Sequence, residues 1–289
     1  MSDLLPWDAM AKVANNLIDK GDKMIDRLSN FFVWCVNHDT PNRIALDTYI
    51  SDIQNSDMDP LTKAALISNA RKTIREYKNQ CNIVAIAMEN LKSDAQPDKV
   101  DEDWLAQFMD KARLVNNAEL QQWWGRILAG ECNSPGSVPK TLLHTLEQMD
   151  VDSASGFMAV ANFTIAVEIK NGDVDYQPLI LIKKINDFYE RYGVTLNVLV
   201  DLQTLGLINF DLIKEFAWDV KDCKNNSVVY HDQKCNINTD KRQIPVGNVI
   251  FSKGGNSLCS IVAREKVDGF FEKICIPYWE REFKKDNEQ

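Results

Sequence analysis

The chain has 289 residues, 45% of them hydrophobic and 26% charged, which is typical of a soluble protein large enough for two compact regions. With 12 glycines and 9 prolines, it has no fibrous or low-complexity character. The net charge of −9 is uneven, because residues 1–182 hold 17 basic and 26 acidic side chains whereas residues 183–289 hold 16 of each. An acidic body argues against wholesale nucleic-acid binding, since that affinity comes largely from Lys and Arg neutralising phosphates.

The start of the chain and its cysteines bear on the cellular compartment. The first residues lack a basic segment followed by an apolar core and a cleavage site, so we expect no secretory signal. The apolar run at residues 28–36 is too short to span a bilayer, and we predict a cytoplasmic protein without a transmembrane segment. The 7 cysteines are an odd number without a repeated spacing, which favours buried or free thiols over a disulfide framework.

Residues 4–36 are typical of one or two amphipathic helices, with aromatic and aliphatic side chains on one side and charged side chains on the other. Such helices can lie on a membrane surface, or pack on their own protein or on a partner. The basic residues are few and acidic residues stand among them, which favours packing. We therefore treat residues 1–58 as an N-terminal region of amphipathic helices.

A long helix is predicted from Asp59 and Pro60 to about Lys92, because a proline costs little at the start of a helix. Its apolar residues recur at alternating steps of three and four, a heptad pattern typical of helices that wind on one another. This seam consists of Ile67, Ala70, Ile74, Tyr77, Cys81, Val84, Met88 and Leu91. It predicts either a helical hairpin within the chain or a coiled coil between copies, in which Ile67, Ile74 and Val84 would lie at the interface of a homo-oligomer.

Residues 100–137 form the stretch that is densest in apolar and aromatic anchors, of which Trp104 and Trp124 are the most prominent. The anchors recur at helical spacing in two blocks, which predicts two helices of a buried core. We also expect the protein to dock on a partner through these aromatic-rich helices. The stretch therefore indicates packing rather than chemistry.

Local capping signals divide this stretch. Acidic residues from Asp101 onward open the first helix, where they favour the positive end of the helix dipole. Asn116, three residues before Glu119, suits the N-cap of the second helix. Residues 133–136 are strong turn formers that end this helix, and Ser137 suits the N-cap of a further one.

The segments 103–105, 124–131 and 133–137 together resemble a bacterial family known only as a domain of unknown function, which is often encoded in mobile or prophage-like regions. The resemblance extends more loosely to about residue 258, over the later part of the chain. It implies no established activity and no catalytic residues. Its genomic setting suggests a part in phage defence or prophage biology.

Arg126 is the single residue of this motif for which we most expect a specific role, since it lies beside Gly125 in an apolar helix. Its guanidinium can pair with Glu131 or with an acidic residue at 101–103, or it can bind a carboxylate of a ligand. Structural pairing is the favoured interpretation.

The pattern changes to mixed α and β beyond about residue 171. Helices are predicted at residues 183–192 and 195–206. Strands are predicted at residues 178–182 and 214–220. Two further elements flank a Gly-rich tip that begins at Lys253, and a last helix over residues 267–283 is expected to kink at Pro277. This order is similar to a winged helix, in which a helix is followed by a β-hairpin wing.

A winged helix raises the hypothesis of DNA binding, because such folds lay one helix in the major groove beside a basic wing. The local charges oppose it. No Lys or Arg lies between Tyr192 and Ile213, whereas Asp201 and Asp211 do, and Lys253 alone marks the expected wing tip. Groups that contact phosphate and guanine are thus missing from the expected recognition helix, which favours packing or protein contact. Nucleic-acid binding stays open as the alternative.

The polar loop that holds Cys223, His231 and Cys235 is a candidate zinc site, since zinc accepts such ligands. Their spacings match no common zinc finger, and a fourth ligand would have to come from far away. The Gly254-Gly255 pair lacks the lysine of a phosphate-binding loop and suits a hairpin tip. No metal ligand and no cofactor-binding residue is therefore predicted.

Catalysis finds little support in the residue pattern. The three histidines, at positions 38, 144 and 231, do not stand in a signature of a nucleophile with its base. Acidic residues at 101–103, or Asp173 with Asp175, could form a metal-dependent site. A helix dipole explains the first group and an exposed turn the second, so an enzyme with an acidic site stays a second alternative.

These patterns predict a mainly α protein with a C-terminal α+β region of winged-helix type. We expect three regions: amphipathic helices at 1–58, a helical hairpin or bundle with the family motif at 59–170, and the winged-helix-like domain at 171–289. The predicted function is non-enzymatic interaction with a protein partner or with a second copy. The residues expected at interaction surfaces are Ile67, Ile74, Val84, Trp104, Trp124, Arg126 and Lys253.

Overall fold

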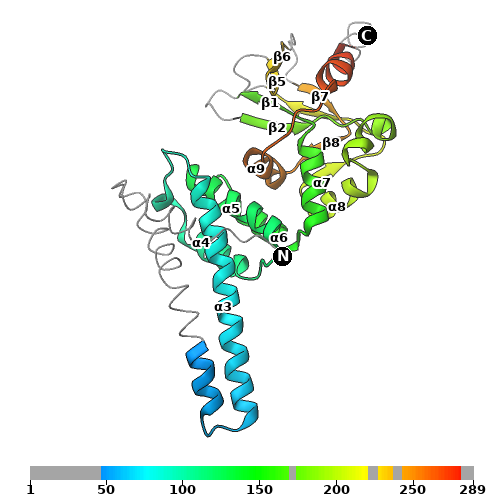
Figure 1. Ribbon diagram of the computed structural model, residues 1–289. Helices are drawn as coiled ribbons and strands as arrows, with labels where there is room; N and C mark the ends of the chain where they lie inside the picture. The colour runs from blue at the N-terminus through cyan, green and yellow to red at the C-terminus, as the bar shows by residue number, and fades with distance from the viewer. Residues whose placement is uncertain (1–46, 169–173, 221–226, 237–242, 281–289) are drawn as a thin grey trace. The chain divides into compact units, whose positions relative to one another are not determined.

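The structure is a computed structural model that describes residues 47–168, 174–220, 227–236 and 243–280 (Figure 1). Packing divides the chain into two compact units, Met1–Leu143 and His144–Gln289. Packing alone does not test whether the three regions predicted from the sequence fold independently. These domain boundaries therefore stay predictions. The amphipathic helices expected at residues 4–36 lie outside the described residues.

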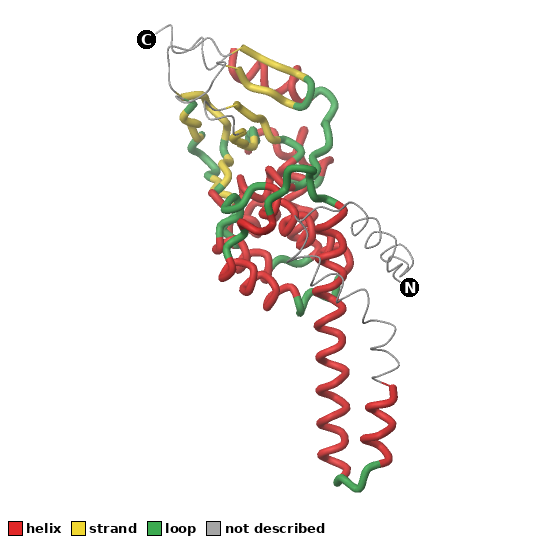
Figure 2. The backbone as a smooth tube through the Cα atoms, turned by 90° about the vertical axis from the view of Figure 1, so that its left-hand side faces the viewer, coloured by secondary structure: helices red, strands yellow, loops and turns green. Residues whose placement is uncertain are grey.

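The first unit begins with two antiparallel helices that lie side by side (Figures 1 and 2). Residues 47–55 form one, and α3 (Pro60–Glu89) forms the other. Asp59 caps α3 by accepting hydrogen bonds from the backbone N–H groups of its first turn, and Pro60 occupies the first helical position. The predicted long helix is therefore confirmed, and it ends a few residues earlier than expected.

The second half of α3 packs against α4 (Glu102–Ala112) and α5 (Ala118–Asn133) and is buried on every side from Ile83 to Met88. A helix surrounded in this way belongs to a core. The crossing with α5 is close at Gly125, where a β-carbon would lie 2.4 Å from Ile86 Cγ2. The predicted pair of core helices is confirmed.

The aromatic anchors of these helices stack on one another inside the first unit. The rings of Trp104 and Phe108 are stacked with centroids 5.1 Å apart, and Phe108 contacts Trp124 at the same 5.1 Å. The indole Nε1 of Trp104 donates to the carbonyl oxygen of Val138 at 3.0 Å. Buried aromatic pairs of this kind add stabilisation beyond their buried area.

Two N-cap predictions in this unit are wrong. Asn117, not Asn116, caps α5 by accepting hydrogen bonds from Glu119 N at 2.8 Å and Leu120 N at 3.1 Å. The amide oxygen of Asn116 instead accepts from Asn79 Nδ2 of α3, at 3.0 Å. Two adjacent asparagines have equal local propensity, so a tertiary contact decides which one caps the helix.

The other error concerns Ser137, because the helix after the turn, α6, begins later and spans Lys140–Gln148. The turn is held from the preceding helix, since the carboxylate of Glu131 accepts hydrogen bonds from Gly136 N and Val138 N. By contrast, α4 starts as expected, with Asp101 as its N-cap and two acidic residues in its first turn.

The first helix that lies wholly in the second unit is α7 (Val151–Ala161), which Asp150 caps by accepting from Ser153 N. A four-stranded antiparallel sheet of order β2-β1-β5-β6 follows. Its strands are β1 (Thr164–Glu168), β2 (Val174–Pro178), β5 (Ser227–Tyr230) and β6 (Gln233–Asn236). The sequence patterns do not predict β1, and the strand expected at residues 178–182 is wrong, because β2 ends at Pro178 and Ile180 makes a single bridge to Gly247.

Short helical turns cover residues 182–192, namely η3 (Ile182–Lys184), η4 (Ile185–Tyr189) and η5 (Glu190–Tyr192). They lead into α8 (Leu196–Thr204), at the position predicted for a helix. Two antiparallel strand pairs complete this part of the unit. They join β3 (Ile208–Phe210) to β8 (Val249–Phe251) and β4 (Phe216–Asp219) to β7 (Gln243–Gly247).

The expected hairpin tip at residues 253–256 is wrong, because these residues begin a helix, α9 (Lys253–Ile261). Ser252 caps it by accepting from Gly255 N. A β-carbon at Gly255 would lie 2.0 Å from the carbonyl oxygen of Leu207, so glycine allows α9 to pack directly on backbone. The Gly pair thus serves packing, and Lys253 stands at a helix start rather than at a wing tip.

The last described helix runs over residues 270–280 and is irregular, as predicted. A wide π-type turn, η6 (Phe271–Cys275), precedes Pro277, which has no N–H to continue the regular bonding. None of the helices in the described segments has the length and apolar character that a membrane crossing needs.

Candidate functional site

The helix α8 of the second unit carries two exposed aliphatic side chains. Thr195 caps it by accepting from Val198 N at 3.2 Å, and Leu199 and Leu202 anchor it in the core. On the other face, Leu196 is 43% exposed and Val200 is 49% exposed. Since these two residues are four apart, they form a continuous apolar strip on the solvent side.

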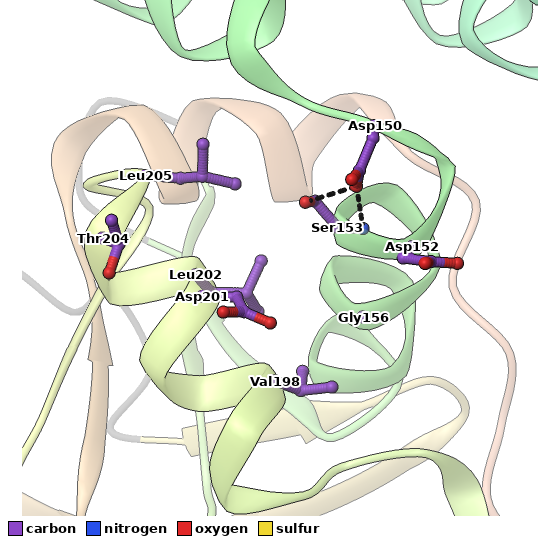
Figure 3. A pocket seen from close by; sticks show the side chains of 9 residues that line it. All are labelled: Asp150, Asp152, Ser153, Gly156, Val198, Asp201, Leu202, Thr204 and Leu205. Carbon is purple, nitrogen blue, oxygen red and sulfur yellow. Dashed lines mark hydrogen bonds between the residues drawn. The ribbon is translucent and has the colours of Figure 1, made fainter.

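A groove of about 370 Å³ runs between α7 and α8 (Figure 3). A β-carbon at Gly156 would lie 2.9 Å from Val198 Cγ1, so the missing side chain lets the two helices approach closely. Figure 3 shows Val198, Asp201 and Leu202 lying between the helices. The groove is lined by Asp150, Asp152, Ser153, Gly156, Val198, Asp201, Leu202, Thr204 and Leu205.

Carboxylates give this groove a negative potential. Asp150, Asp152 and Asp201 all line it, and none of the described residues around it is basic. The side-chain and backbone hydrogen bonds that Asp150 accepts from Ser153 lower the pKa of its carboxyl group. The carboxylate of Asp150 is therefore ionised at neutral pH.

Thr204 ends α8 and follows Val200 by one helical turn. The Thr204 hydroxyl donates to the carbonyl oxygen of Val200 at 2.9 Å, and Thr204 also lines the groove. Leu196 and Val200 nevertheless lie on the face of α8 opposite Val198 and Leu202, so the strip and the groove are separate features. We call the face that carries Leu196 and Val200 the α8 surface. Its chemistry suits an apolar partner group.

The interaction residues predicted from the sequence lie elsewhere and in both units. Val84, Trp104 and Trp124 are buried in the core of the first unit, at 0%, 2% and 2% exposure. Such side chains support a surface from beneath and do not reach a partner directly. Ile67, Ile74 and Arg126 are half-buried, and Lys253 is exposed. Their part in interaction stays a prediction.

The pairing expected between Arg126 and Glu131 is wrong. Glu131 is 1% exposed and directs both carboxylate oxygens at backbone N–H groups, at 2.6 Å from Gly136 N and 2.8 Å from Val138 N. Asp101 pairs with Lys140 at 2.9 Å. Arg126 forms no ion pair with a residue in the described segments. The carboxylate of Glu131 therefore holds the turn that follows α5, and this buried acid has a structural role.

Burial dominates the electrostatics of Glu131. The loss of hydration raises the pKa of its carboxyl group, and the two backbone hydrogen bonds only partly oppose this. The acid nevertheless keeps both of its oxygens satisfied, as buried polar groups generally must.

The acidic and metal-binding alternatives gain no support. Asp175 accepts hydrogen bonds from Trp218 Nε1 at 2.8 Å and from Asn256 Nδ2, so it ties β2 to β4 and α9. Its expected neighbour Asp173 and the zinc candidate Cys223 lie outside the described residues. Within the described ranges, no three or more His, Cys, Asp or Glu side chains are grouped to hold a metal ion.

The remaining candidates in the zinc loop have other surroundings. His231 adopts a φ of 52° and its ring lies 4.7 Å from that of Tyr230, while burial lowers the pKa of its imidazole. Cys132, Cys235, Cys259 and Cys275 are free, in agreement with the prediction of free thiols. Cys81 departs from that prediction, because it is disulfide-bonded.

Fold and surface together define a mainly α-helical protein with small antiparallel sheets in its second unit. A family model described as "Protein of unknown function (DUF2806)" matches residues 68–275, and the chain belongs to this family. The resemblance inferred from the sequence motif to an uncharacterised domain family is thereby confirmed. Neither the curated proteins nor the solved structures contain a match to the chain.

Proposed function

We propose that the protein is a non-enzymatic protein-interaction module whose partner docks on α8. The observation that carries this proposal is the outer face of α8, where Leu196 and Val200 are exposed. Large aliphatic side chains at neighbouring exposed positions lose unfavourable hydration when a partner covers them.

We infer that α8 takes the place of the recognition helix of a winged helix. The order of elements that supports this is α7, the bridge at Ile180, the turns at 182–192, α8 and the paired strands β3 and β8. In such proteins the helix at the place of α8 enters the major groove of DNA. In this chain that helix and the segments beside it, from Gly193 to Leu212, contain no Lys or Arg. We infer that the arrangement serves protein contact here.

Affinity capture from the host, with and without nuclease, tests the proposal. We expect a protein partner that survives nuclease and that is lost when Leu196 and Val200 are both changed to Ser. The matched control is Leu61→Ser, which removes an aliphatic side chain that is 80% exposed in the other unit and should leave capture unchanged. Capture of nucleic acid alone, abolished by nuclease, would instead establish the winged-helix regulator as the function.

Self-association is a second candidate, supported by the first half of α3. This half extends beyond α4 and α5 and carries Ile67 and Ile74, which are half-buried (Figures 1 and 2). A second copy could bury them further in a coiled coil. Light scattering of the Ile67→Asp/Ile74→Asp variant should then give half the mass of the wild type, and an unchanged mass excludes this seam. Val84 is unsuitable for the test, because it is fully buried.

The biological setting is also proposed. The family resemblance suggests a part in phage defence or prophage biology, and the cytoplasmic location stays a prediction. Metal-dependent turnover of nucleotides or nucleic acids by the purified protein would move the acidic-enzyme alternative to first place.

A further inference from the structure

We propose that the turn between β3 and β4 inserts Leu212 and Ile213 into an anionic lipid surface, with neighbouring lysines at the level of the lipid phosphates. The inference goes beyond the proposed function, because it concerns a different surface and a different class of partner. It follows from the exposure of the two aliphatic side chains, from the hydrogen bonds that fix the turn, and from the charges beside it.

Two large aliphatic side chains stand in water at this turn. Ile213 is 93% exposed and Leu212 is 61% exposed. The exposed large hydrophobic residues of the described segments include no other pair that is adjacent in the chain. Single exposed aliphatic side chains are ordinary on a protein surface, whereas contiguous ones are often sites of contact with a partner or a membrane.

The exposed pair belongs to a closed turn. The carboxylate of Asp211 accepts hydrogen bonds from Ile213 N at 2.8 Å and from Lys214 N at 2.7 Å. These backbone hydrogen bonds lower the pKa of Asp211, so its carboxylate is ionised at neutral pH and keeps the turn closed.

The buried residue Asn248 fixes the same turn at both ends. Its backbone carbonyl oxygen accepts from Asp211 N at 3.1 Å, and its Nδ2 donates to the carbonyl oxygen of Lys214 at 3.2 Å. Its Oδ1 accepts from Ile182 N at 3.0 Å, which brings the two lysines that follow Ile182 beside the turn. A turn held in this way loses little conformational entropy when its tip is buried.

The lysines give the turn a local positive charge. Lys183 pairs with Glu215 at 3.5 Å, whereas neither Lys184 nor Lys214 forms an ion pair with a described residue. The nearby acid Asp211 directs a carboxylate oxygen at the backbone of the turn. Residues 183–289 as a whole hold equal numbers of basic and acidic side chains, so this part of the chain does not oppose an anionic surface.

An aliphatic pair beside lysines matches the chemistry of a lipid headgroup region. Aliphatic side chains gain free energy at the boundary of the acyl chains. Lysines bury their methylene stems there and keep their ammonium groups among the phosphates. A nucleic acid also offers phosphates, but its affinity depends on many cations, and this turn has few. We therefore take an anionic bilayer as the partner.

Vesicle flotation of the purified full-length chain tests the inference. Vesicles of equal parts phosphatidylcholine and phosphatidylglycerol are compared with vesicles of phosphatidylcholine alone. We expect binding to the anionic vesicles that weakens as salt is added, and weaker binding to the neutral ones. Absence of binding to the anionic vesicles, or equal binding to both kinds, would overturn the inference.

A pair of aliphatic variants locates the contact. Leu212→Ser/Ile213→Ser should reduce the affinity for the anionic vesicles by more than about tenfold. Leu196→Ser/Val200→Ser removes two exposed aliphatic side chains from α8 and should bind these vesicles like the wild type. Because partner capture is judged with the second variant and vesicle binding with the first, the proposed function and this inference fail separately.

A pair of charge variants tests the lysines. Lys184→Gln/Lys214→Gln should reduce the affinity for the anionic vesicles by about thirtyfold at low salt and leave the binding to phosphatidylcholine unchanged. Lys234→Gln/Lys253→Gln removes the same charge from exposed positions elsewhere in the second unit and should have no such effect. Equal losses in the two charge variants would overturn the assignment to this turn.

Ile213→Trp reports insertion itself. Brominated lipid in the anionic vesicles should quench the fluorescence of this variant more strongly than that of the wild type, because the added indole enters the acyl boundary. Equal quenching would show that the tip stays in water and would overturn the inference. Loss of a captured protein by Leu212→Ser/Ile213→Ser, without any vesicle binding by the wild type, would overturn it in favour of a protein contact.

Discussion

Replacing Glu131 by Gln tests whether the family motif is built around this buried acid. The carboxylate accepts two backbone hydrogen bonds, at 2.6 Å from Gly136 N and 2.8 Å from Val138 N. Gln keeps one acceptor oxygen, but its amide group meets the second N–H as a donor facing a donor. A hydrogen bond to a charged group contributes about 1.5–3 kcal/mol, and an unsatisfied buried donor costs about 1–3 kcal/mol. We expect a loss of about 2 kcal/mol.

Urea unfolding at pH 7, followed by circular dichroism and tryptophan fluorescence, measures this loss. Glu89→Gln is the matched control, because it makes the same chemical change at an exposed position of α3. The control should alter the free energy of unfolding by no more than about 0.5 kcal/mol. A Glu131→Gln variant as stable as the control would refute the argument that this carboxylate holds the turn.

The raised pKa of Glu131 predicts how the stability loss caused by Glu131→Gln changes with pH. The pKa of Glu131 is raised in the folded state above the ordinary value of 4.5, so the folded protein binds more protons than the unfolded chain in the window above that value. Stability of the wild type therefore falls as the pH rises through this window, whereas the glutamine of the variant does not titrate. The loss caused by Glu131→Gln should be larger at about pH 4.5 than at pH 7. A loss that grows with pH would contradict the raised pKa.

Two further predictions concern other packed positions. Gly125→Ala should destabilise the first unit by about 1–3 kcal/mol in urea unfolding, because its β-carbon would lie 2.4 Å from Ile86 Cγ2, and an unchanged midpoint would contradict the close crossing. Asp150→Ala should cost about 1 kcal/mol through loss of the α7 cap. The pKa of Asp150 is lowered, so its contribution to stability is present above the ordinary value of 3.8 and is lost as the pH falls through the folded value. Unfolding at pH 3 should therefore show a smaller difference between variant and wild type than unfolding at pH 7.

Local sequence patterns were sufficient to locate α3, α4 and α5 of the first unit and to show that α8 lacks basic residues. The three-and-four spacing of apolar residues located α3, α4 and α5, because helical periodicity is a local property of the chain. The absence of Lys and Arg between Tyr192 and Ile213 was equally readable, and it directed the interpretation of α8 toward protein contact.

Tertiary contacts were needed wherever distant segments compete for one group. Asn117 rather than Asn116 caps α5, because Asn79 of α3 binds the side chain of Asn116. Gly255 lies in a helix rather than at a hairpin tip, since α9 packs directly on the backbone at Leu207. The choice in each case depends on a partner that local propensity does not contain.

The groove of the candidate site also depends on tertiary contacts between distant segments. Asp150 and Asp152 belong to α7 and its cap and Asp201 to α8, and no local pattern relates them. The groove that they line forms because Gly156 allows α7 to approach Val198 of α8. The charges were thus present in the sequence, whereas the groove depends on helix packing, which is a long-range property of the folded chain.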